Sequence, residues 1–395
     1  MFLEFAWNAW EKRKLGELAN IRRGASPRPI KNKKWFSQTS QVGWIRISDV
    51  TEQNGRIHQV EQHLSDAGQK KTLVLKSKHL LLSIAATVGK PVQNYIQVGV
   101  HDGFIVFMDP KFDLDFMFYF LEKYRPNWAR FGQPGSQINI NSELVRDLVV
   151  SIPTVHEQVA VAQFIITLDN LIAATQDKID ALEQAKKALL QRLFDQSWRF
   201  KGYSDPWEKR KLGEVVERVT RKNRDLVSTR PLTISAQDGL VDQRKFFSKT
   251  VASKNISNYF LLKAGDFAYN KSYSVGYPWG AVKRLDKYPS GVLSTLYIVF
   301  KPKKINSQFL VTYFEGTTWY VSVSKVASEG ARNHGLLNIS ASDFFDQQLF
   351  FPTKKTEQES IGLTIKVLDD LIAATQSRLS SLELLKKALL QDLFI

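Results

Sequence analysis

The sequence contains the same unit twice. Three segments of the first copy return unchanged in the second: Trp10–Glu17 as Trp207–Glu214, Leu171–Gln176 as Leu371–Gln376, and Lys186–Gln191 as Lys386–Gln391. The first segment returns after 197 residues and the other two after 200. Three such matches in register indicate a tandem duplication of a unit of about 200 residues.

The two copies have not diverged evenly. Between residues 168–194 and 368–394, 18 of 27 positions are identical, whereas residues 17–150 and 214–350 share only scattered echoes. A scaffold that carries two different recognition surfaces would keep the first pair of segments alike while the second pair changed.

The well-preserved segments carry a helical repeat. Their apolar residues recur at alternating spacings of three and four, which is the a/d pattern of a coiled coil over about four heptads. The residues predicted to pair the helices are Leu168, Ile172, Ile179, Leu182, Leu189, Leu368, Ile372, Leu379, Leu382 and Leu389. Two such helices in one chain pair most simply antiparallel, and a helix of roughly 40 residues is about 60 Å long.

Lysines interrupt this seam at two equivalent a positions, Lys186 and Lys386. We favour the interpretation that each lysine extends out of the seam into solvent. The alternatives are a device that fixes the register of the helices and a contact with a partner.

The positive charge lies outside the helices. The chain of 395 residues has a formal net charge of +16, of which +6 falls in residues 16–150 and +8 in residues 213–350. An excess of this size favours an acidic partner, and nucleic acid is the commonest large one. Because the helical segments are close to neutral, the pattern predicts basic globular readers on a neutral frame.

The globular regions mix short strands with helices. Strand-like runs occur at residues 42–50, 73–86, 103–107, 260–269 and 293–300, and helices are predicted at residues 113–124 and 307–319. We predict an α+β fold with two globular domains joined by two long helices that form an antiparallel coiled coil, a pseudo-twofold tandem repeat. The predicted division is 1–152, first recognition domain; 153–198, first spacer helix and linker; 199–351, second recognition domain; and 352–395, second spacer helix.

Cations, amides and hydroxyls gather in the loops of these regions, and such side chains contact phosphates and base edges. Each residue taken singly is more often an ordinary surface group, but the sets together favour DNA. The first region offers Arg22, Arg23, Arg28, Lys31, Lys33, Lys34, Arg46, Ser48, Gln133, Ser136, Gln137 and Asn139. The second region offers Arg221, Lys222, Arg224, Asn270, Lys271, Ser272, Tyr273, Arg332, Asn333 and His334.

Catalytic and metal-binding patterns are missing. The chain has no cysteine, its six histidines lack metal-ligand spacing, and residues 131–135 only superficially resemble a cofactor glycine loop. We therefore predict no catalytic residue, no metal and no cofactor bound by this chain. The first ten residues do not form a signal peptide and no apolar run approaches the length of about 20 residues that a membrane span needs, so we expect a cytoplasmic protein.

The layout resembles the specificity subunit of type I restriction–modification systems over essentially the whole chain. The most specific marks are the Trp-Glu-x-Arg-Lys-Leu-Gly-Glu segments at Trp10 and Trp207. Further marks are the exits in which a proline precedes a Glu-Gln pair, at residues 152–158 and 351–358. The link at residues 199–203 also resembles that family, whereas residues 2–5 of the first copy depart from it.

The resemblance implies a non-catalytic subunit of a phage-defence complex. Such a subunit reads a bipartite, asymmetric DNA target, one half-site per domain, across a gap that the helices fix. It holds two modification subunits, which methylate adenine with S-adenosylmethionine bound to themselves, and motor–nuclease subunits join the full complex. The outer faces of the helices are expected to dock the modification subunits.

Three other functions remain open at this point. A coiled-coil transcription regulator or architectural DNA-binding protein would explain the charge and the helices, but not unlike readers on like frames. A nuclease or methyltransferase with unrecognised motifs would show activity as an isolated chain. A scaffold that binds only proteins would show no salt-dependent binding to duplex DNA.

Overall fold

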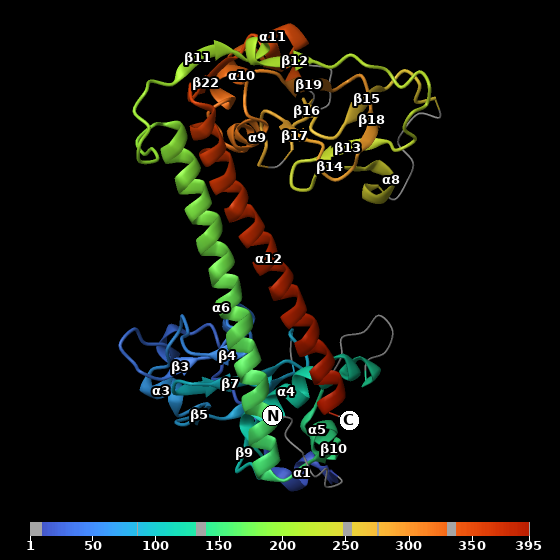
Figure 1. Cartoon of the computed structure of the whole chain (residues 1–395). Helices are drawn as coiled ribbons and strands as arrows, with labels where there is room; N and C mark the ends of the chain where they lie inside the picture. Colours follow the sequence, from blue (N-terminus) through green and yellow to red (C-terminus); the bar gives the residue numbers. More distant parts are fainter. Residues whose placement is uncertain are drawn as a thin grey trace. The chain divides into compact units, whose positions relative to one another are not determined.

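A computed structural model describes residues 10–84, 86–131, 140–247, 255–274, 276–329 and 337–394. The chain forms two compact units: unit 1 comprises Met1–Thr175 and Arg378–Ile395, and unit 2 comprises Gln176–Ser377. Each unit contains one globular α+β part together with a segment of both long helices, α6 (Val155–Phe194) and α12 (Lys355–Leu393) (Figure 1).

Unit 1 is built on a five-stranded sheet. Its strands lie in the order β2 (Asn20–Arg23), β9 (Phe104–Met108), β6 (Leu80–Ser83), β7 (Pro91–Asn94) and β4 (Arg56–Ile57). A smaller sheet has the order β3 (Gly43–Trp44), β8 (Val98–Val100) and β5 (Leu73–Leu75), and β1 (Glu11–Lys14) pairs with β10 (Val149–Ile152). Strands β6, β7 and β8 are buried at every position, whereas β1 and β2 at the sheet edges are mostly exposed.

The helices of the globular part of unit 1 are α1 (Leu15–Leu18), α2 (Ile47–Glu52), α3 (Asp66–Gln69), α4 (Leu114–Tyr124) and α5 (Ser142–Asp147). Short 3-10 turns cover Lys33–Trp35 and Arg125–Phe131. Helix α4 begins at Asp113, whose carboxylate accepts the backbone N–H of Phe116 at 2.8 Å. Six consecutive residues of α4, Phe116 to Leu121, are buried, so this helix forms the centre of the core.

Unit 2 repeats the strand order with different sequences. Its main sheet is β12 (Val216–Arg218), β19 (Ile298–Pro302), β16 (Phe267–Asn270) and β17 (Ala281–Arg284), which matches β2, β9, β6 and β7 of unit 1. The other pairs are β11 (Glu208–Lys211) with β22 (Gln348–Phe351), β15 (Phe260–Lys263) with β18 (Ser290–Leu293), β13 (Leu232–Ser235) with β14 (Gly239–Asp242), and β20 (Ser328–Glu329) with β21 (Leu337–Asn338). Its short helices are α7 (Leu212–Val215), α8 (Gln243–Phe246), α9 (Ser307–Glu315), α10 (Tyr320–Val326) and α11 (Ala341–Phe345).

The Glu-Gln pair of each copy explains part of the repeated sequence. The Gln158 side-chain oxygen accepts the backbone N–H of Asp113 at 2.8 Å, and its amide donates to the carbonyl of Pro153 at 2.8 Å. Gln358 makes the same two bonds, to Asn306 at 2.8 Å and to Pro352 at 2.7 Å. Both glutamines are buried, and their amides satisfy backbone groups that would otherwise lack partners.

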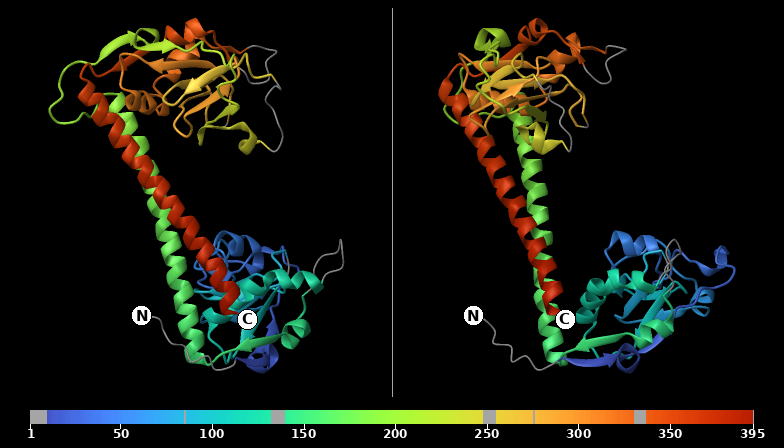
Figure 2. Two further views of the ribbon diagram at one scale, coloured as in Figure 1. Left: turned by 45° about the vertical axis from the view of Figure 1, so that its right-hand side comes forward. Right: turned by 90° about the vertical axis from the view of Figure 1, so that its right-hand side faces the viewer.

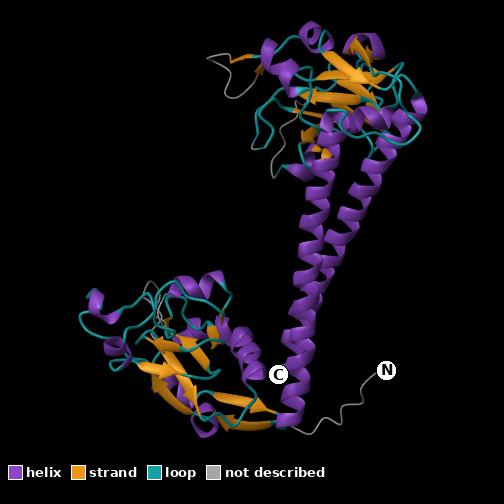
Figure 3. Ribbon diagram, turned by 90° about the vertical axis from the view of Figure 1, so that its left-hand side faces the viewer, coloured by secondary structure: helices purple, strands orange, loops and turns teal. Residues whose placement is uncertain are grey.

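The end of each long helix fills the core of a globular part. Phe394, at the end of α12, is fully buried in unit 1 and packs against Trp10, Phe116 and Phe120. Phe194, at the end of α6, packs in unit 2 against three residues at equivalent positions, Trp207, Phe309 and Tyr313. Figures 2 and 3 show the strands of each globular part gathered beside these helix ends.

The two long helices pair antiparallel within each unit. In unit 1 Lys386 of α12 contacts Asp169 of α6, and in unit 2 Lys186 of α6 contacts Asp369 of α12. Of the residues predicted to pair the helices, Leu168, Ile179 and Ile372 are buried and Ile172, Leu182, Leu189, Leu368, Leu379, Leu382 and Leu389 are half-buried. The interpretation that Lys186 and Lys386 extend into solvent is wrong, because each lysine lies against an aspartate of the other helix.

The predicted fold class is confirmed, since each unit is α+β and the long helices pair antiparallel in both. The predicted strand at residues 42–50 is largely wrong: only Gly43–Trp44 is a strand and Ile47–Glu52 is helical. The Asp49 side chain accepts the backbone N–H of Arg46 at 2.7 Å and thereby starts this helix, which overrides the β-branched composition.

The expectation about apolar length also needs correction. Among the described residues α6 is the one helix that is long and apolar enough to cross a membrane by length and composition. A third of the apolar window is buried inside the protein, where Leu168 belongs to the helix seam. Length and composition alone are therefore weak evidence for a membrane span.

Candidate nucleic-acid interface

Two predicted side chains of unit 1, those of Arg23 and Arg28, contact Asp102, which follows β8. Arg28 forms an ion pair with the Asp102 carboxylate at 2.7 Å, and Arg23 donates to the Asp102 carbonyl at 2.7 Å. Ser26 donates its hydroxyl to the same carboxylate at 2.6 Å. Arg22 is exposed on the same strand as Arg23. These contacts tie the loop after β2 to Asp102, while the Arg28 side chain stays 70% exposed.

Hydrogen bonding keeps Asp102 ionised. The Ser26 hydroxyl contributes most to lowering the pKa of the Asp102 carboxyl, partial burial opposes this, and the Arg28 guanidinium lowers the pKa further. Next to it, burial lowers the pKa of His101, against a smaller opposing effect of Asp102. His101 is therefore neutral at pH 7, and its Nδ1 accepts the backbone N–H of Gly103 at 2.8 Å.

A second basic group lies on the 3-10 turn before β3. Lys31, Lys33 and Lys34 are all exposed, and the Lys34 ammonium lies 4.2 Å from the centre of the Trp35 ring. Trp35 is buried and donates its indole N–H to the carbonyl of Pro29 at 3.0 Å. The buried tryptophan anchors the turn, so that the cations project from a fixed base.

Arg46 and Ser48 have different environments. Arg46 contacts the carboxylates of Glu61 and Asp49, and the Glu61 hydrogen bond contributes most to raising the pKa of its guanidinium. Ser48 is exposed on α2. Arg46 is consequently engaged within the protein, whereas Ser48 presents its hydroxyl to solvent.

In unit 2, Arg221 and Lys222 are held against β15 and Arg224 projects beyond it. Arg221 pairs with Asp266 at 2.7 Å and donates to the carbonyl of Leu261 at 3.1 Å. The Lys222 ammonium lies 4.1 Å from the centre of the Phe260 ring. Arg224 is exposed and forms no ion pair with the part of the chain that the structure describes.

The group after β16 forms a separate cluster in unit 2. Asn270 accepts the backbone N–H of Ser272 at 3.1 Å, which shapes the turn. Lys271 donates to the carbonyl of Ile339 at 3.3 Å. Tyr273 is 59% exposed, which leaves its ring free to stack.

Several predicted residues lie outside the described residues. They are Gln133, Ser136, Gln137 and Asn139 in the first copy and Arg332, Asn333 and His334 in the second. Most of the remaining predicted residues form one cluster around Asp102 and one on the Trp35 turn in unit 1, and one beside β15 and one after β16 in unit 2. Arg46 and Ser48 lie apart from these clusters, at the start of α2.

The structure also shows a basic and aromatic cluster that the sequence analysis did not single out. Asp242 caps α8 and pairs with Arg244 at 2.7 Å, and Arg230 lies 4.2 Å from the centre of the Tyr288 ring. Phe246, at the end of α8, is 47% exposed. The run of two cations and two phenylalanines at residues 244–247 was the signal that could have identified it.

No group of three or more histidine, aspartate or glutamate side chains that could hold a metal ion occurs among the described residues. The clusters described above present cations, hydroxyls and amides. Their chemistry therefore suits contact with phosphates and base edges.

Comparison with known proteins gives one family and several relatives. Residues 8–184 match the family described as type I restriction modification DNA specificity domain. A curated relative, the type I restriction enzyme MjaVIII specificity subunit of Methanocaldococcus jannaschii, is 24% identical over 306 residues, which cover 70% of this chain and 68% of that protein.

Three solved structures share the fold over nearly the whole chain. The S subunit of a type I restriction-modification system from M. genitalium has a TM-score of 0.59 at 14% identity and covers 100% of this chain and 98% of its own. The HsdS subunit from Thermoanaerobacter tengcongensis has a TM-score of 0.53 at 15% identity, with 98% and 96% covered. The third chain comes from a structure that concerns complex assembly and conformational transition of the type I R-M system. It has a TM-score of 0.53 at 14% identity, and the match covers 98% of this chain and 97% of that one. The resemblance found in the sequence is confirmed.

Proposed function

We propose that this chain selects the DNA target of a type I restriction–modification complex. Residues 8–184 match the type I restriction modification DNA specificity domain, and the whole chain shares the fold of type I specificity subunits. Each globular part reads one half of a bipartite, asymmetric target. The chain itself carries out no reaction.

The observation that supports this proposal most directly is that the two units share one strand framework but carry different basic surfaces. The strand order β2-β9-β6-β7 returns as β12-β19-β16-β17, and the buried glutamines make the same bonds in both units. The cations stand on this frame in different settings, around Asp102 in unit 1 and beside β15 in unit 2. Two different basic surfaces on one repeated frame suit two different half-sites.

The proposed partners dock on the helices. Several large apolar side chains of the helices remain exposed: Phe164 and Leu171 on α6, and Leu363, Val367 and Leu371 on α12. In each repeat they lie on the part of the helix that follows the Glu-Gln pair. We assign them to two modification subunits, which bind S-adenosylmethionine and methylate adenine, and motor–nuclease subunits complete a cytoplasmic restricting assembly.

A methylation map tests the proposal. DNA from a host that co-expresses this chain with its modification subunit is sequenced with a method that detects N6-methyladenine. We expect a split methylated motif that is lost when this chain is omitted. Absence of new methylation, with both proteins folded and associated, would overturn the proposal and favour a DNA-binding regulator.

A further inference from the structure

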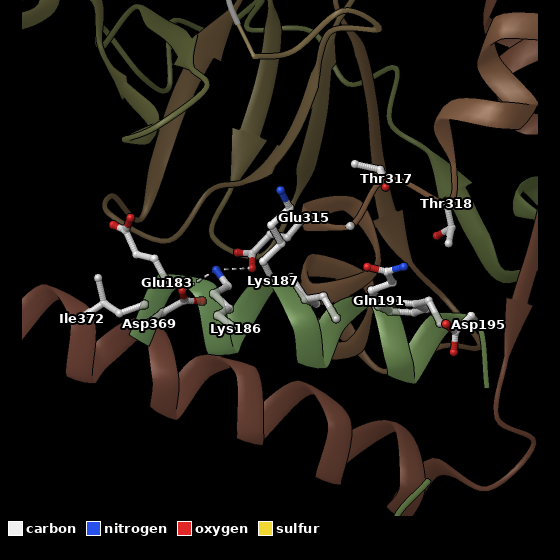
Figure 4. Close-up of a pocket in the computed structure, with 13 residues that line it drawn as sticks. Glu183, Lys186, Lys187, Gln191, Asp195, Glu315, Thr317, Thr318, Asp369 and Ile372 are labelled. Carbon is white, nitrogen blue, oxygen red and sulfur yellow. Dashed lines mark hydrogen bonds and ion pairs between the residues drawn. The ribbon is translucent and has the colours of Figure 1, made fainter. Parts of the chain in front are cut away.

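The lysine in the seam of α6 joins three elements of unit 2. Lys186 contacts Asp369 of α12, and its ammonium lies 2.8 Å from a carboxylate oxygen of Glu315, the last residue of α9. Figure 4 shows the three side chains converging at the wall of a cavity of about 680 Å³. The Lys186 side chain is only 20% exposed, so most of its surface lies against these elements.

The equivalent lysine joins three elements of unit 1 by a different route. The Lys386 ammonium lies 2.5 Å from one carboxylate oxygen of Asp169 in α6. The other oxygen of Asp169 accepts the phenolic hydroxyl of Tyr119 in α4 at 2.7 Å. In unit 2 the lysine pairs with a carboxylate of the globular part. In unit 1 the hydrogen bond to the globular part comes from the aspartate, and the Lys386 ammonium lies 5.9 Å from the centre of the Tyr119 ring.

These groups keep the forms that the contacts require. Burial alone would lower the pKa of Lys186, but the carboxylates of Glu315 and Asp369 outweigh burial and raise it, so the ammonium stays charged. Burial, and then Asp169, raise the pKa of Tyr119, so the phenol keeps the proton that it donates. A charged group in an apolar seam contributes little net stability. Its best attested role is to select one register among several.

The sequence places an aspartate opposite each lysine in only one register. If α12 slid by seven residues along α6, Lys186 would face Gln376 or Gly362 in place of Asp369. The same shift would bring Lys386 opposite Gln176 or Ala162 in place of Asp169. Within the seam, the leucines and isoleucines repeat every seven residues and would tolerate this shift, whereas the charged pairs would not. The shift would also withdraw Phe194 and Phe394 from their cores, so the charged pairs act together with these rings.

We infer that Lys186 and Lys386 set the register of the two long helices and seat each globular part on that register. The second part of the inference rests on the proposed function: by setting the register, the two lysines also determine the length of the gap between the half-sites.

The absence of cysteine in the chain allows a direct test of register. The pair Lys186–Asp369, extended by heptad spacing, places Leu182 opposite Ile372. A chain with Leu182→Cys and Ile372→Cys should therefore form a disulfide in the native register. The pairs Leu182→Cys with Ile365→Cys, and Leu189→Cys with Ile372→Cys, report slips of seven residues in the two directions.

The register variant is Lys186→Met with Lys386→Met, which fills the seam with apolar side chains. We expect the slipped cysteine pairs to cross-link at least about 5-fold more in this background. The matched control, Lys187→Met with Lys387→Met, changes exposed neighbours outside the seam and should cross-link like the parent. Lys186→Arg with Lys386→Arg keeps the charge and should restore the native pair. If the methionine variant cross-linked through the native cysteine pair alone, as the parent does, the inference would be overturned.

The methylation map of the same variants tests the second part. We expect the half-sites to persist in the methionine variant and additional gap lengths to appear. One unchanged gap together with slipped cross-links would overturn the link from register to gap. If the parent chain directs no methylation, the proposed function fails while the cross-linking result still decides the register.

Discussion

The two units have the same framework of strands and long helices, but they differ in the hydrogen bonds that its repeated glutamate receives. In unit 2, Glu357 is buried and receives both Trp207 and a bidentate Arg199, at 2.9 and 2.8 Å. In unit 1 the equivalent Glu157 is half-buried and receives Trp10 at 3.2 Å, its one described side-chain partner. The linker between the repeats supplies Arg199, whereas the first copy has Phe2 at that position. Both units keep the glutamate–tryptophan contact, and the bidentate arginine is an addition of the second copy.

The recognition surfaces of the two units, in contrast to the framework, have little in common. Their strands follow the same order, but no cation of the Asp102 cluster has an equivalent in the cluster beside β15. Contacts that hold the frame involve buried amides and aromatic rings, which tolerate few alternatives. Contacts that shape the surfaces are partly exposed ion pairs, each of which contributes little to stability and can change freely.

The largest expected effect comes from exchanging one surface. Replacing residues 16–150 by the corresponding region of another specificity subunit should change one half-site completely and leave the other unchanged, because each unit has its own core. Methylation mapping of the chimera measures both half-sites at once. A change in both halves would show that the units do not read independently.

The two aromatic sockets, which are the clusters of rings that surround Phe394 in unit 1 and Phe194 in unit 2, should respond equally to substitution. Phe394→Ala removes a fully buried ring from unit 1, and Phe194→Ala removes the equivalent ring from unit 2. Each should lower the free energy of unfolding by about 3–5 kcal/mol, the usual effect for a buried phenylalanine. Urea unfolding measures both, and the exposed Phe164→Ala on α6 serves as control. A loss confined to one variant would show that the two sockets are not equivalent.

The glutamates should respond unequally. Glu357→Gln keeps the shape but deprives Arg199 of its charged partner, and we expect a loss of about 2–3 kcal/mol, the range for hydrogen bonds to charged groups. Glu157→Gln weakens one bond to a tryptophan and should cost about 1 kcal/mol. The difference in unfolding free energy between the two variants is the measured quantity. Equal losses of unfolding free energy in the two variants would show that Arg199 does not add to the stability of unit 2.

The sequence predicted the elements whose pattern is local and repeated. The heptad pattern predicted both long helices, and the helix predicted at residues 113–124 corresponds to α4. The helix predicted at residues 307–319 is shorter in the structure, because α9 ends at Glu315. The sequence did not predict that Phe394 and Phe194 leave the helix seam for the cores, because a socket formed by residues far along the chain has no local signature. Nor could it show that Arg28 and Arg221 pair with Asp102 and Asp266, because those aspartates lie 74 and 45 residues away. The role of the seam lysines was misjudged for the same reason, since their partners belong to the other helix.

The exposed cations offer a smaller effect on DNA binding. Arg224 forms no ion pair within the described chain, so a phosphate contact there displaces no internal partner, whereas Arg28 would have to exchange Asp102 for the phosphate. Arg224→Ala should lower the slope of log affinity against log salt by about 1, and Arg28→Ala by less. Titrations with duplex DNA over a range of salt concentrations measure the slope. Arg210→Ala, on the frame strand β11, should leave it unchanged.

The smallest effect concerns pH and one unit only. Burial lowers the pKa of His101 in the folded state below its ordinary value of about 6.5, so the unfolded chain binds the proton more tightly. The stabilisation from neutral His101 is therefore complete above that value, and it declines as the pH falls from about 6.5 toward the lower folded pKa. The loss is at most about 1.4 kcal/mol per pH unit. The matching position after β18 in unit 2 is Ser294, which does not titrate. Unfolding of the full chain between pH 7 and 5, compared with His101→Ser, should show the decline in the parent alone; the same decline in both proteins would assign it to another group.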